Sequence, residues 1–147
     1  MFFKKKKKAK EEYPVVDVSI DDIRQAITTC ANELPMGVSL RSFINDDCSI
    51  NYELLKPFLK AIPERTYYMS KETFEVFESP DLPRTIDQVQ RAVDQYIQET
   101  KQLPVIPGNP DNKISYYMIR NYLKEEPEFE LYLEVKDHLV THRRPES

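Results

Sequence analysis

Apolar residues recur every three or four positions in two separate stretches of the chain. The first stretch covers residues 20–34 and the second covers residues 86–97. This spacing places the apolar side chains on one face of a helix, so each stretch predicts an amphipathic helix that packs against a core. Ser19 and Thr85 stand directly before the two stretches, where a hydroxyl side chain can cap the first turn. A Leu-Pro pair after each stretch predicts where each helix ends, because the residue before proline avoids the α region.

A second apolar stripe of helical spacing follows each of the first two. It covers residues 50–62 and residues 114–123, and Pro57 inside the former predicts a kink. Each of these stripes is followed by two short runs rich in β-branched and aromatic residues around a polar turn, which predicts a β-hairpin. The paired runs are residues 65–69 with 73–77, and residues 130–134 with 138–141.

The two halves of the chain also match in sequence. Residues 50–60 align with residues 114–124, and a Pro-Glu pair and a tyrosine recur at the same distance after each block. We therefore predict an α+β fold built from an internally duplicated helix–helix–β-hairpin unit, with about four main helices and two hairpins. Because a unit of roughly 60 residues is marginal alone, the two copies are expected to pack as one pseudo-twofold domain.

This interpretation sets the domain boundaries. Residues 1–12 form a basic disordered tail, residues 13–78 the first unit, residues 79–84 a linker and residues 85–147 the second unit. Residues 13–147 are expected to be one compact domain.

Composition excludes several common classes of protein. The chain of 147 residues has only 2 glycines, which cannot build a glycine-rich phosphate loop. Its 2 cysteines are too few for a secreted domain held by disulfides. Cys30 falls on the apolar stripe and is expected to be a buried hydrophobic residue, whereas the acidic surroundings of Cys48 disfavour its thiolate. Without an apolar segment of spanning length or a signal peptide, the expected location is the cytoplasm.

Charge is divided unevenly along the chain. Residues 1–10 hold six lysines and no acidic residue, so the formal net charge of −4 leaves −10 on the rest. An acidic body is a poor partner for nucleic acid. The segment could contact an anionic membrane surface or another anion, or it could simply be solvated. The residues that would make such a contact are Phe2, Phe3, Lys4, Lys5, Lys6, Lys7 and Lys8.

No motif in the chain predicts catalysis, a cofactor or a metal. The catalytic signatures with glycine, serine, histidine or cysteine at fixed spacing are missing, and His138 and His142 lack an obvious third ligand. We expect no catalytic, cofactor-binding or metal-binding residue. One loop is a candidate for ligand binding, although its Asn and Asp residues are equally typical of turns that bond their own backbone. The loop residues are Gly108, Asn109, Asp111 and Asn112.

Tyrosines provide the best indication of a partner surface. Two adjacent tyrosines on a strand point to opposite faces, so one of each pair is expected to be exposed, and tyrosine is favoured at interfaces. The alternative is that they pack the hairpins against the helices. The candidate surface comprises Tyr67, Tyr68, Tyr116, Tyr117 and Tyr132.

These observations favour a non-catalytic protein-interaction or regulatory module whose partner is another protein. One alternative is a nucleic-acid-binding tandem of winged-helix-like units, since the order of helices and hairpin is similar. A second alternative is a peripheral membrane protein that binds through residues 1–10. An enzyme whose site is assembled from scattered residues would leave no signature in the sequence.

Three sequence blocks resemble those of small uncharacterised proteins of Bacillus-type Gram-positive bacteria. The blocks are LPVIPGNP at residues 103–110, ISYY at 114–117 and LVTHRRP at 139–145. The resemblance implies a bacterial, cytoplasmic setting and carries no activity or catalytic residue with it.

Overall fold

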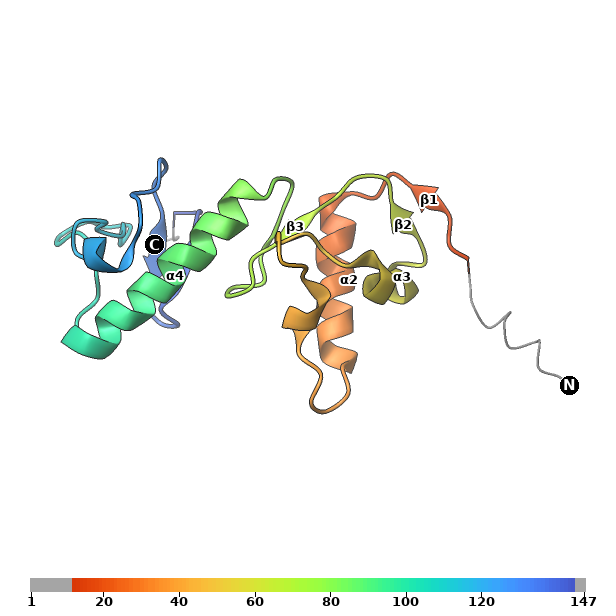
Figure 1. Cartoon of the computed structure of the whole chain (residues 1–147), viewed down its shortest axis with the longest axis horizontal. Coiled ribbons are helices and arrows are strands. Elements are labelled where there is room, and N and C mark those ends of the chain that lie inside the picture. Colours follow the sequence, from red (N-terminus) through yellow and green to blue (C-terminus); the bar gives the residue numbers. More distant parts are fainter. Residues whose placement is uncertain (1–11, 145–147) are drawn as a thin grey trace, which may run out of the picture.

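The computed structural model of the protein describes residues 12–144. Figure 1 shows two lobes side by side along the long axis, each built around one long helix. We call residues 12–76 lobe 1 and residues 77–144 lobe 2. The helices of lobe 1 are α2 (Ile20–Glu33), the 3₁₀ helix η1 (Leu40–Phe43) and α3 (Tyr52–Leu59), and those of lobe 2 are α4 (Asp81–Thr100) and the 3₁₀ helix η2 (Arg120–Tyr122). The mixed α+β expectation is confirmed.

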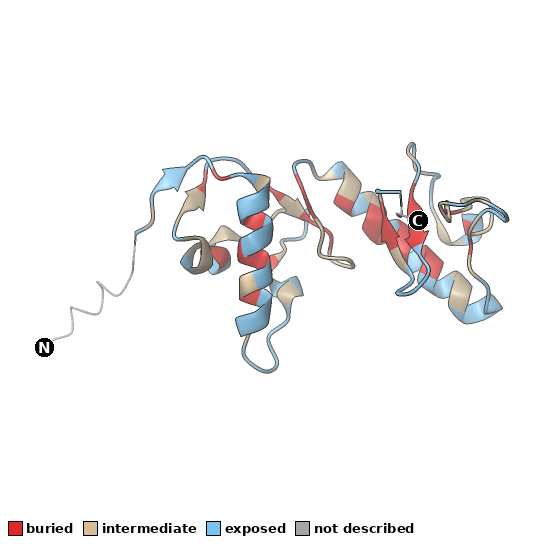
Figure 2. Ribbon diagram, turned by 180° about the vertical axis from the view of Figure 1, so that it is seen from behind, coloured by how far each residue is buried: buried red, intermediate tan, exposed pale blue. Residues whose placement is uncertain are grey.

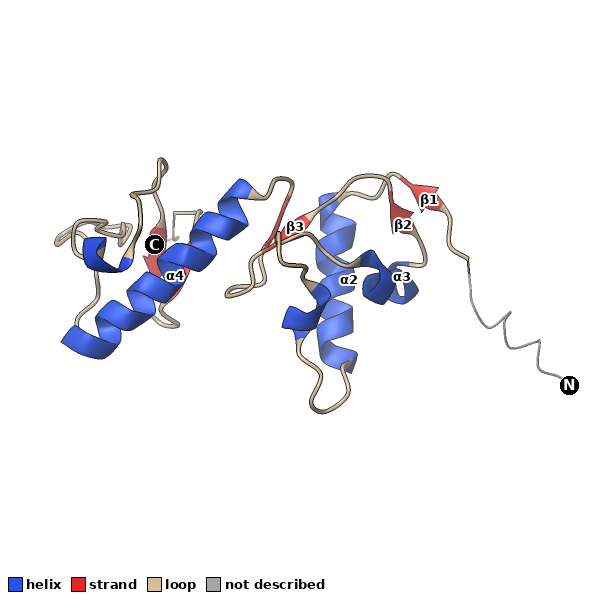
Figure 3. Cartoon of the chain, viewed as in Figure 1, coloured by secondary structure: helices blue, strands red, loops and turns tan. Residues whose placement is uncertain are grey.

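The strands are short and form three two-stranded sheets (Figure 3). A parallel pair joins the start of lobe 1 to the segment after α3, and each lobe contributes one antiparallel hairpin at a predicted position. The strands are β1 (Val15–Val16) with β2 (Ile62–Pro63), β3 (Tyr68–Met69) with β4 (Val76–Phe77), and β5 (Tyr132–Glu134) with β6 (Leu139–Thr141). The hairpins are therefore confirmed, whereas the parallel pair is a feature that the sequence pattern did not predict.

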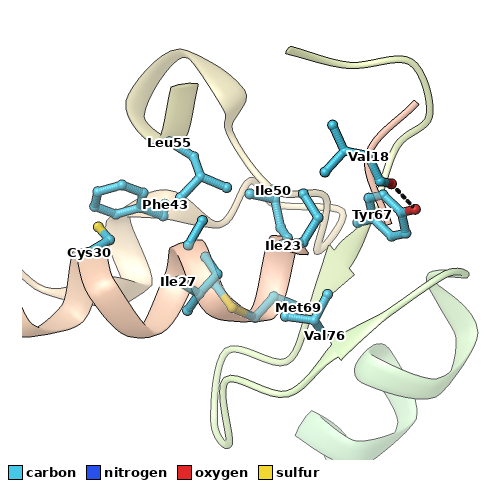
Figure 4. Close-up of a cluster of buried hydrophobic side chains, with 11 residues drawn as sticks. Val18, Ile23, Ile27, Cys30, Phe43, Ile50, Leu55, Tyr67, Met69 and Val76 are labelled. Atoms are coloured by element: carbon cyan, nitrogen blue, oxygen red, sulfur yellow. Dashed lines mark hydrogen bonds between the residues drawn. The ribbon is translucent and has the colours of Figure 1, made fainter. Parts of the chain in front are cut away.

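Each lobe has its own hydrophobic core, and the buried residues form two separate clusters in Figure 2. Ile23 and Leu55 are fully buried in the first core (Figure 4), and Ile86 and Leu131 are fully buried in the second. Each such side chain contributes roughly 1.5–3 kcal/mol by leaving water. Strand β4 is shared, because Val76 belongs to the first core and Phe77 to the second.

Helix α2 begins and ends as its sequence predicts. The Ser19 hydroxyl accepts a hydrogen bond from the backbone N–H of Asp22 at 3.1 Å, and Leu34 leaves the helical conformation directly before Pro35. Cys30 lies fully buried on the apolar face, as expected.

Helix α4 begins five residues earlier than its sequence predicts. Its first residue is Asp81, so the predicted linker, residues 79–84, lies largely inside the helix and the predicted cap at Thr85 is wrong. Pro83 occupies the first turn, where the missing N–H of a proline costs no hydrogen bond and its fixed φ suits a helix. Pro83 is buried and Leu82 packs against the second core, so tertiary contacts stabilise this additional turn.

The second helix predicted for the later half does not form. Residues 114–123 contain turns and η2, with hydrogen bonds three residues apart such as Tyr122 N–H to the Ile119 carbonyl at 2.9 Å. Three tyrosines, a serine and an asparagine in this stretch have weaker helix propensity than the residues of α3, and the core contact of Ile119 is made without an α-helix. Residues 12–144 therefore contain three α-helices instead of four, and the winged-helix interpretation loses its second recognition helix.

Hydrogen bonds in the two lobes recur 64 residues apart. The N–H of Ile50 donates to the Tyr67 carbonyl at 3.0 Å, and that of Ile114 donates to the Leu131 carbonyl at 2.9 Å. The hydroxyl of Tyr52 donates to the carbonyl of residue 65 at 2.8 Å, as that of Tyr116 does to the carbonyl of residue 129 at 2.7 Å. Burial raises the pKa of Tyr52 to about 12, and it raises the pKa of Tyr116 as well.

One buried carboxylate connects the two lobes. Asp87 of α4 is 4% exposed and accepts hydrogen bonds from the Ser70 hydroxyl at 2.6 Å and from the backbone N–H groups of Lys71 and Glu72 at 3.0 and 3.1 Å. All three donors belong to the turn between β3 and β4. The thiol of Cys48 lies 3.8 Å from the same carboxylate. Burial and the neighbouring Asp87 charge raise the pKa of this thiol, so Cys48 stays protonated.

Candidate interaction site

Strand β1 fills the open backbone edge of β2 in lobe 1. The N–H of Ile62 donates to the Pro14 carbonyl at 2.8 Å, and the N–H of Glu64 donates to the Val16 carbonyl at 2.9 Å. The two strands run parallel, and Val18 at the end of the segment is buried in the first core. The Tyr67 hydroxyl then donates to the Val18 carbonyl at 2.6 Å, which fixes the segment in place (Figure 4).

The equivalent edge of lobe 2 carries no strand within residues 12–144. The segment 64 residues after Ile62–Glu64 is Glu126–Glu128, which repeats its Pro-Glu pair. Within the described part of the chain, no hydrogen bond engages the backbone N–H of Glu126 or Glu128. The residues that would take the place of β1 are wound into the first turn of α4 instead. A backbone edge of this kind can pair with an extended peptide.

A cavity lies along this free edge. It has a volume of about 310 Å³, and its two walls are the first turns of α4 and the segment 125–129. We call this cavity the edge groove. Its lining residues on α4 are Asp81, Arg84, Thr85 and Gln88. A second cavity of about 360 Å³ shares Gln88 and continues along α4 to Tyr122 and Leu123. Together these cavities offer room for an extended segment of several residues.

The edge groove is acidic. Its lining includes four carboxylates, those of Asp81, Glu125, Glu126 and Glu128, and one cation, Arg84. The Arg84 guanidinium lies 3.8 Å from the Asp81 carboxylate. The three glutamates are exposed. Lobe 1 has Ala61 and Ile62 at the positions that match Glu125 and Glu126. The free edge therefore combines backbone donors that have no partner among residues 12–144 with three glutamates, where residues 61–65 of lobe 1 hold one glutamate and one arginine.

The structure separates the five candidate tyrosines. Tyr67 and Tyr132 are 1% and 8% exposed, so both belong to the cores and the expectation that they form a surface is wrong for them. Tyr68 and Tyr116 are half-buried, and the Tyr116 hydroxyl is already bonded within lobe 2. Tyr117 is 72% exposed, with the Arg120 guanidinium stacked 3.8 Å from its ring centre. The five side chains do not form one patch.

The loop that contains Gly108, Asn109, Asp111 and Asn112 makes the turns that its sequence also predicted. The Asn109 side chain accepts hydrogen bonds from the N–H groups of Asp111 and Lys113 at 2.9 and 3.3 Å. Asp111 pairs with Arg144 at 3.1 Å, and Asn112 adopts a left-handed φ of 56°. Its polar side chains therefore bond to the loop itself and to the C-terminal segment.

The predicted membrane or anion contact falls on Phe2, Phe3 and Lys4 to Lys8, which lie outside the described residues. Among residues 12–144, no helix has the length and hydrophobicity needed to cross a membrane. In the same range, no group of three His, Cys, Asp or Glu side chains converges as a metal site would require.

A third cavity, which is polar, lies at the seam between the lobes. It has a volume of about 270 Å³ and is lined by Arg24 from α2, Glu75 from the β3–β4 turn, and His142 and Arg143 after β6. Arg143 pairs with Glu75, and the His142 ring lies edge-on to Phe77 at 5.0 Å. Glu75 Oε1 and His142 Nδ1 are buried 3.9 Å apart without hydrogen-bond partners in residues 12–144. Burial lowers the pKa of His142, and Glu75 opposes this effect.

Acidification is expected to destabilise the protein through His142. Because the pKa of His142 in the folded protein lies below the ordinary histidine value of 6.5, the unfolded chain takes up the proton first as the pH falls. The contribution of His142 to the free energy of unfolding is fully present above pH 6.5. It declines as the pH falls towards the pKa of His142 in the folded protein. Chemical denaturation between about pH 7 and pH 5.5 should show a smaller decline for His142→Gln than for the wild type. The control His138→Gln leaves His142 in place and should keep the wild-type decline; an identical decline in all three proteins would contradict the assignment.

Sequence reasoning missed β1 and the free edge of lobe 2. A signal was present, because Val15, Val16 and Val18 form a β-branched run directly before the cap of α2. The repeated Pro-Glu pair also marked residues 62–64 and 126–128 as a match in sequence. What the sequence pattern could not show is that β1 fills the edge of the first segment, while no strand within residues 12–144 covers the second.

Comparison with known proteins supports the family and nothing more specific. No curated protein and no solved structure matches the chain. A family model described as "Protein of unknown function (DUF3939)" matches residues 13–142, which span β1 and both lobes. The chain therefore belongs to the DUF3939 family.

Proposed function

We propose that this protein is a non-catalytic protein-interaction module that binds an extended segment of a partner protein in the edge groove of lobe 2. The observation that carries the proposal is the unequal use of two equivalent edges. Lobe 1 covers its edge with β1, whereas the N–H groups of Glu126 and Glu128 have no partner among the described residues. An added strand would gain backbone hydrogen bonds there, and the neighbouring cavities would receive its side chains.

The filled edge supplies a template for the bound state. In lobe 1, the segment Val16–Val18 runs along a cavity whose other wall includes Phe58 and Leu59. The matching residues of lobe 2 are Tyr122 and Leu123, which line the second cavity. A partner strand in lobe 2 would therefore run parallel to Glu126–Glu128, as β1 runs parallel to β2.

This proposal includes an internal duplication of the unit, with the two copies related by a pseudo-twofold arrangement. Its support is the recurrence at a constant offset of hydrogen bonds, of hairpin register and of left-handed residues. Met69 pairs with Val76 as Leu133 pairs with Val140, and Phe74 has a φ of 63° where His138 has 59°. Such agreement in backbone detail is more specific than agreement in the order of elements.

Peptide selection tests the proposed function. Random peptides displayed on phage are selected on the immobilised full chain, and the selected sequences are synthesised with a fluorophore for anisotropy titration. Glu128→Pro removes one N–H of the free edge and places a ring beside it, so we expect the dissociation constant to rise by at least about tenfold.

Glu128→Ala is the matched control. It removes the same carboxylate but keeps the backbone N–H that the added strand would use. We expect Glu128→Pro to bind the selected peptides at least about tenfold more weakly than Glu128→Ala does, and circular dichroism should show that both variants fold. Selection of no binding peptide, or equal binding by Glu128→Pro, would contradict the proposal.

A further inference from the structure

We infer that the edge groove of one molecule takes the lysine-rich segment, Lys4–Lys8, of a second copy of this chain. This inference rests on the proposed function and names the partner of the same groove. It predicts head-to-tail association, in which each copy offers a basic segment at one end and an acidic groove at the other.

Charge complementarity selects a basic occupant. The groove presents the carboxylates of Glu125, Glu126, Glu128 and Asp81 against the guanidinium of Arg84 alone. A lysine that enters the groove would reduce the repulsion among these carboxylates. Because the groove glutamates are exposed, the attraction depends on ionic strength and weakens as salt is added.

The chain carries a suitable basic segment. Residues 4–8 are five consecutive lysines and Lys10 follows closely, so residues 1–10 carry six positive charges and no acidic residue. Five residues of extended chain span roughly 17 Å, and the edge segment 125–129 is also five residues long. Alternate side chains of a strand point to opposite faces, so successive lysines can contact both the α4 wall and the glutamate wall of the groove.

The position of the segment along the chain favours a second copy. The lysines precede β1, which fills the equivalent edge of lobe 1. Figure 1 shows β1 at the end of lobe 1 that points away from lobe 2. A segment that precedes β1 in the sequence is therefore joined to the side of lobe 1 that is remote from the groove of its own chain, which favours the groove of a neighbouring molecule. A contact between unlike surfaces of this kind does not close on itself as a twofold dimer does, so the assembly lengthens with protein concentration.

Sedimentation velocity of the full chain over a wide range of concentrations tests the inference. We expect the sedimentation coefficient to rise with concentration at low salt and to stay constant at high salt. Reversal of the groove charge (Glu125→Lys, Glu126→Lys and Glu128→Lys together) or of the segment charge (Lys5→Glu, Lys6→Glu and Lys7→Glu together) should abolish the rise. A protein that carries both sets should associate again, because its charges are complementary once more.

The outcomes separate this inference from the proposed function. A wild type that stays monomeric while selected peptides still bind the groove would overturn the inference and leave the proposed function standing. Binding of a synthetic peptide of residues 1–10 by a chain that stays monomeric would overturn the second copy as occupant. Association that survives the groove reversal would overturn the inference too, as would binding of the segment to anionic lipid vesicles without any self-association.

Discussion

Replacement of Asp87 by alanine is expected to lower the free energy of unfolding by about 3 kcal/mol. The carboxylate is 4% exposed and accepts hydrogen bonds from Ser70, Lys71 and Glu72. Its removal leaves the Lys71 N–H and the Ser70 hydroxyl without their acceptor, and it leaves the Glu72 N–H with only the Ser70 hydroxyl oxygen at 3.2 Å. Urea denaturation followed by circular dichroism measures the change.

Two further variants show whether the loss comes from the acceptor geometry. Asp87→Asn preserves the shape but replaces one acceptor oxygen by a donor that would face N–H groups, so it should also be strongly destabilising. Asp21→Ala is the matched control. Asp21 occupies the equivalent place on α2 but is exposed and pairs with Arg24 at 3.2 Å, so a change within about 0.5 kcal/mol is expected. A small effect of Asp87→Ala would show that this carboxylate does not hold the lobes together.

Replacement of Gln90 by alanine is expected to cost about 2 kcal/mol. This side chain is 3% exposed and joins α4 to the second hairpin. Its amide donates to the His138 carbonyl at 2.8 Å, and its oxygen accepts from the Val140 N–H at 2.7 Å. The substitution leaves both backbone groups unpaired and opens space beside the second core. Thermal denaturation by calorimetry measures the loss.

The control for Gln90 lies on the same helix. Gln95 is exposed and makes only a long contact of 3.4 Å with Glu99. Gln95→Ala should therefore leave the transition temperature within experimental error, since alanine is also a good helix former. Equal losses for both variants would show that helix propensity rather than the buried hydrogen bonds controls this part of the fold.

Local sequence signals predicted the parts of the fold that local chemistry determines. The two hairpins form where β-branched and aromatic residues surround a polar turn, and α2 begins at Ser19 because its hydroxyl caps the first turn. The start of α4 is different, because Leu82 and Pro83 are held by the second core and extend the helix past Thr85. Tertiary contacts there override the local cap.

The predictions that were wrong depend on tertiary contacts, which the sequence pattern does not contain. Tyr67 is buried because its ring lies in the first core and its hydroxyl bonds the Val18 carbonyl, 49 residues earlier. The alternation of a strand cannot tell which of two adjacent tyrosines faces inward. Residues 114–123 have helical spacing of apolar positions, yet Ile114 reaches the core from a β-bridge with Val105 and Ile119 reaches it from a turn. A short apolar pattern of this kind is compatible with either structure.

The candidate site was beyond prediction for a related reason. Its defining property is a backbone edge that no strand within residues 12–144 covers, because residues 81–84 form a helical turn where lobe 1 has the extended chain of β1. The acidic residues of the groove were visible in the sequence, but Asp81 and Glu125 are brought together only by the fold.

The additional turn of α4 allows the two lobes of one chain to differ at matching edges. In a symmetric pair of identical subunits, both edges would be filled or both would be free, since every subunit has the same leading segment. Here the two lobes belong to one polypeptide, and the residues that lead into each lobe differ in sequence. One lobe can therefore complete itself with its own strand, while no strand among residues 12–144 covers the matching edge of the other. Joining the lobes covalently makes possible a lasting asymmetry that identical, separate copies could not maintain.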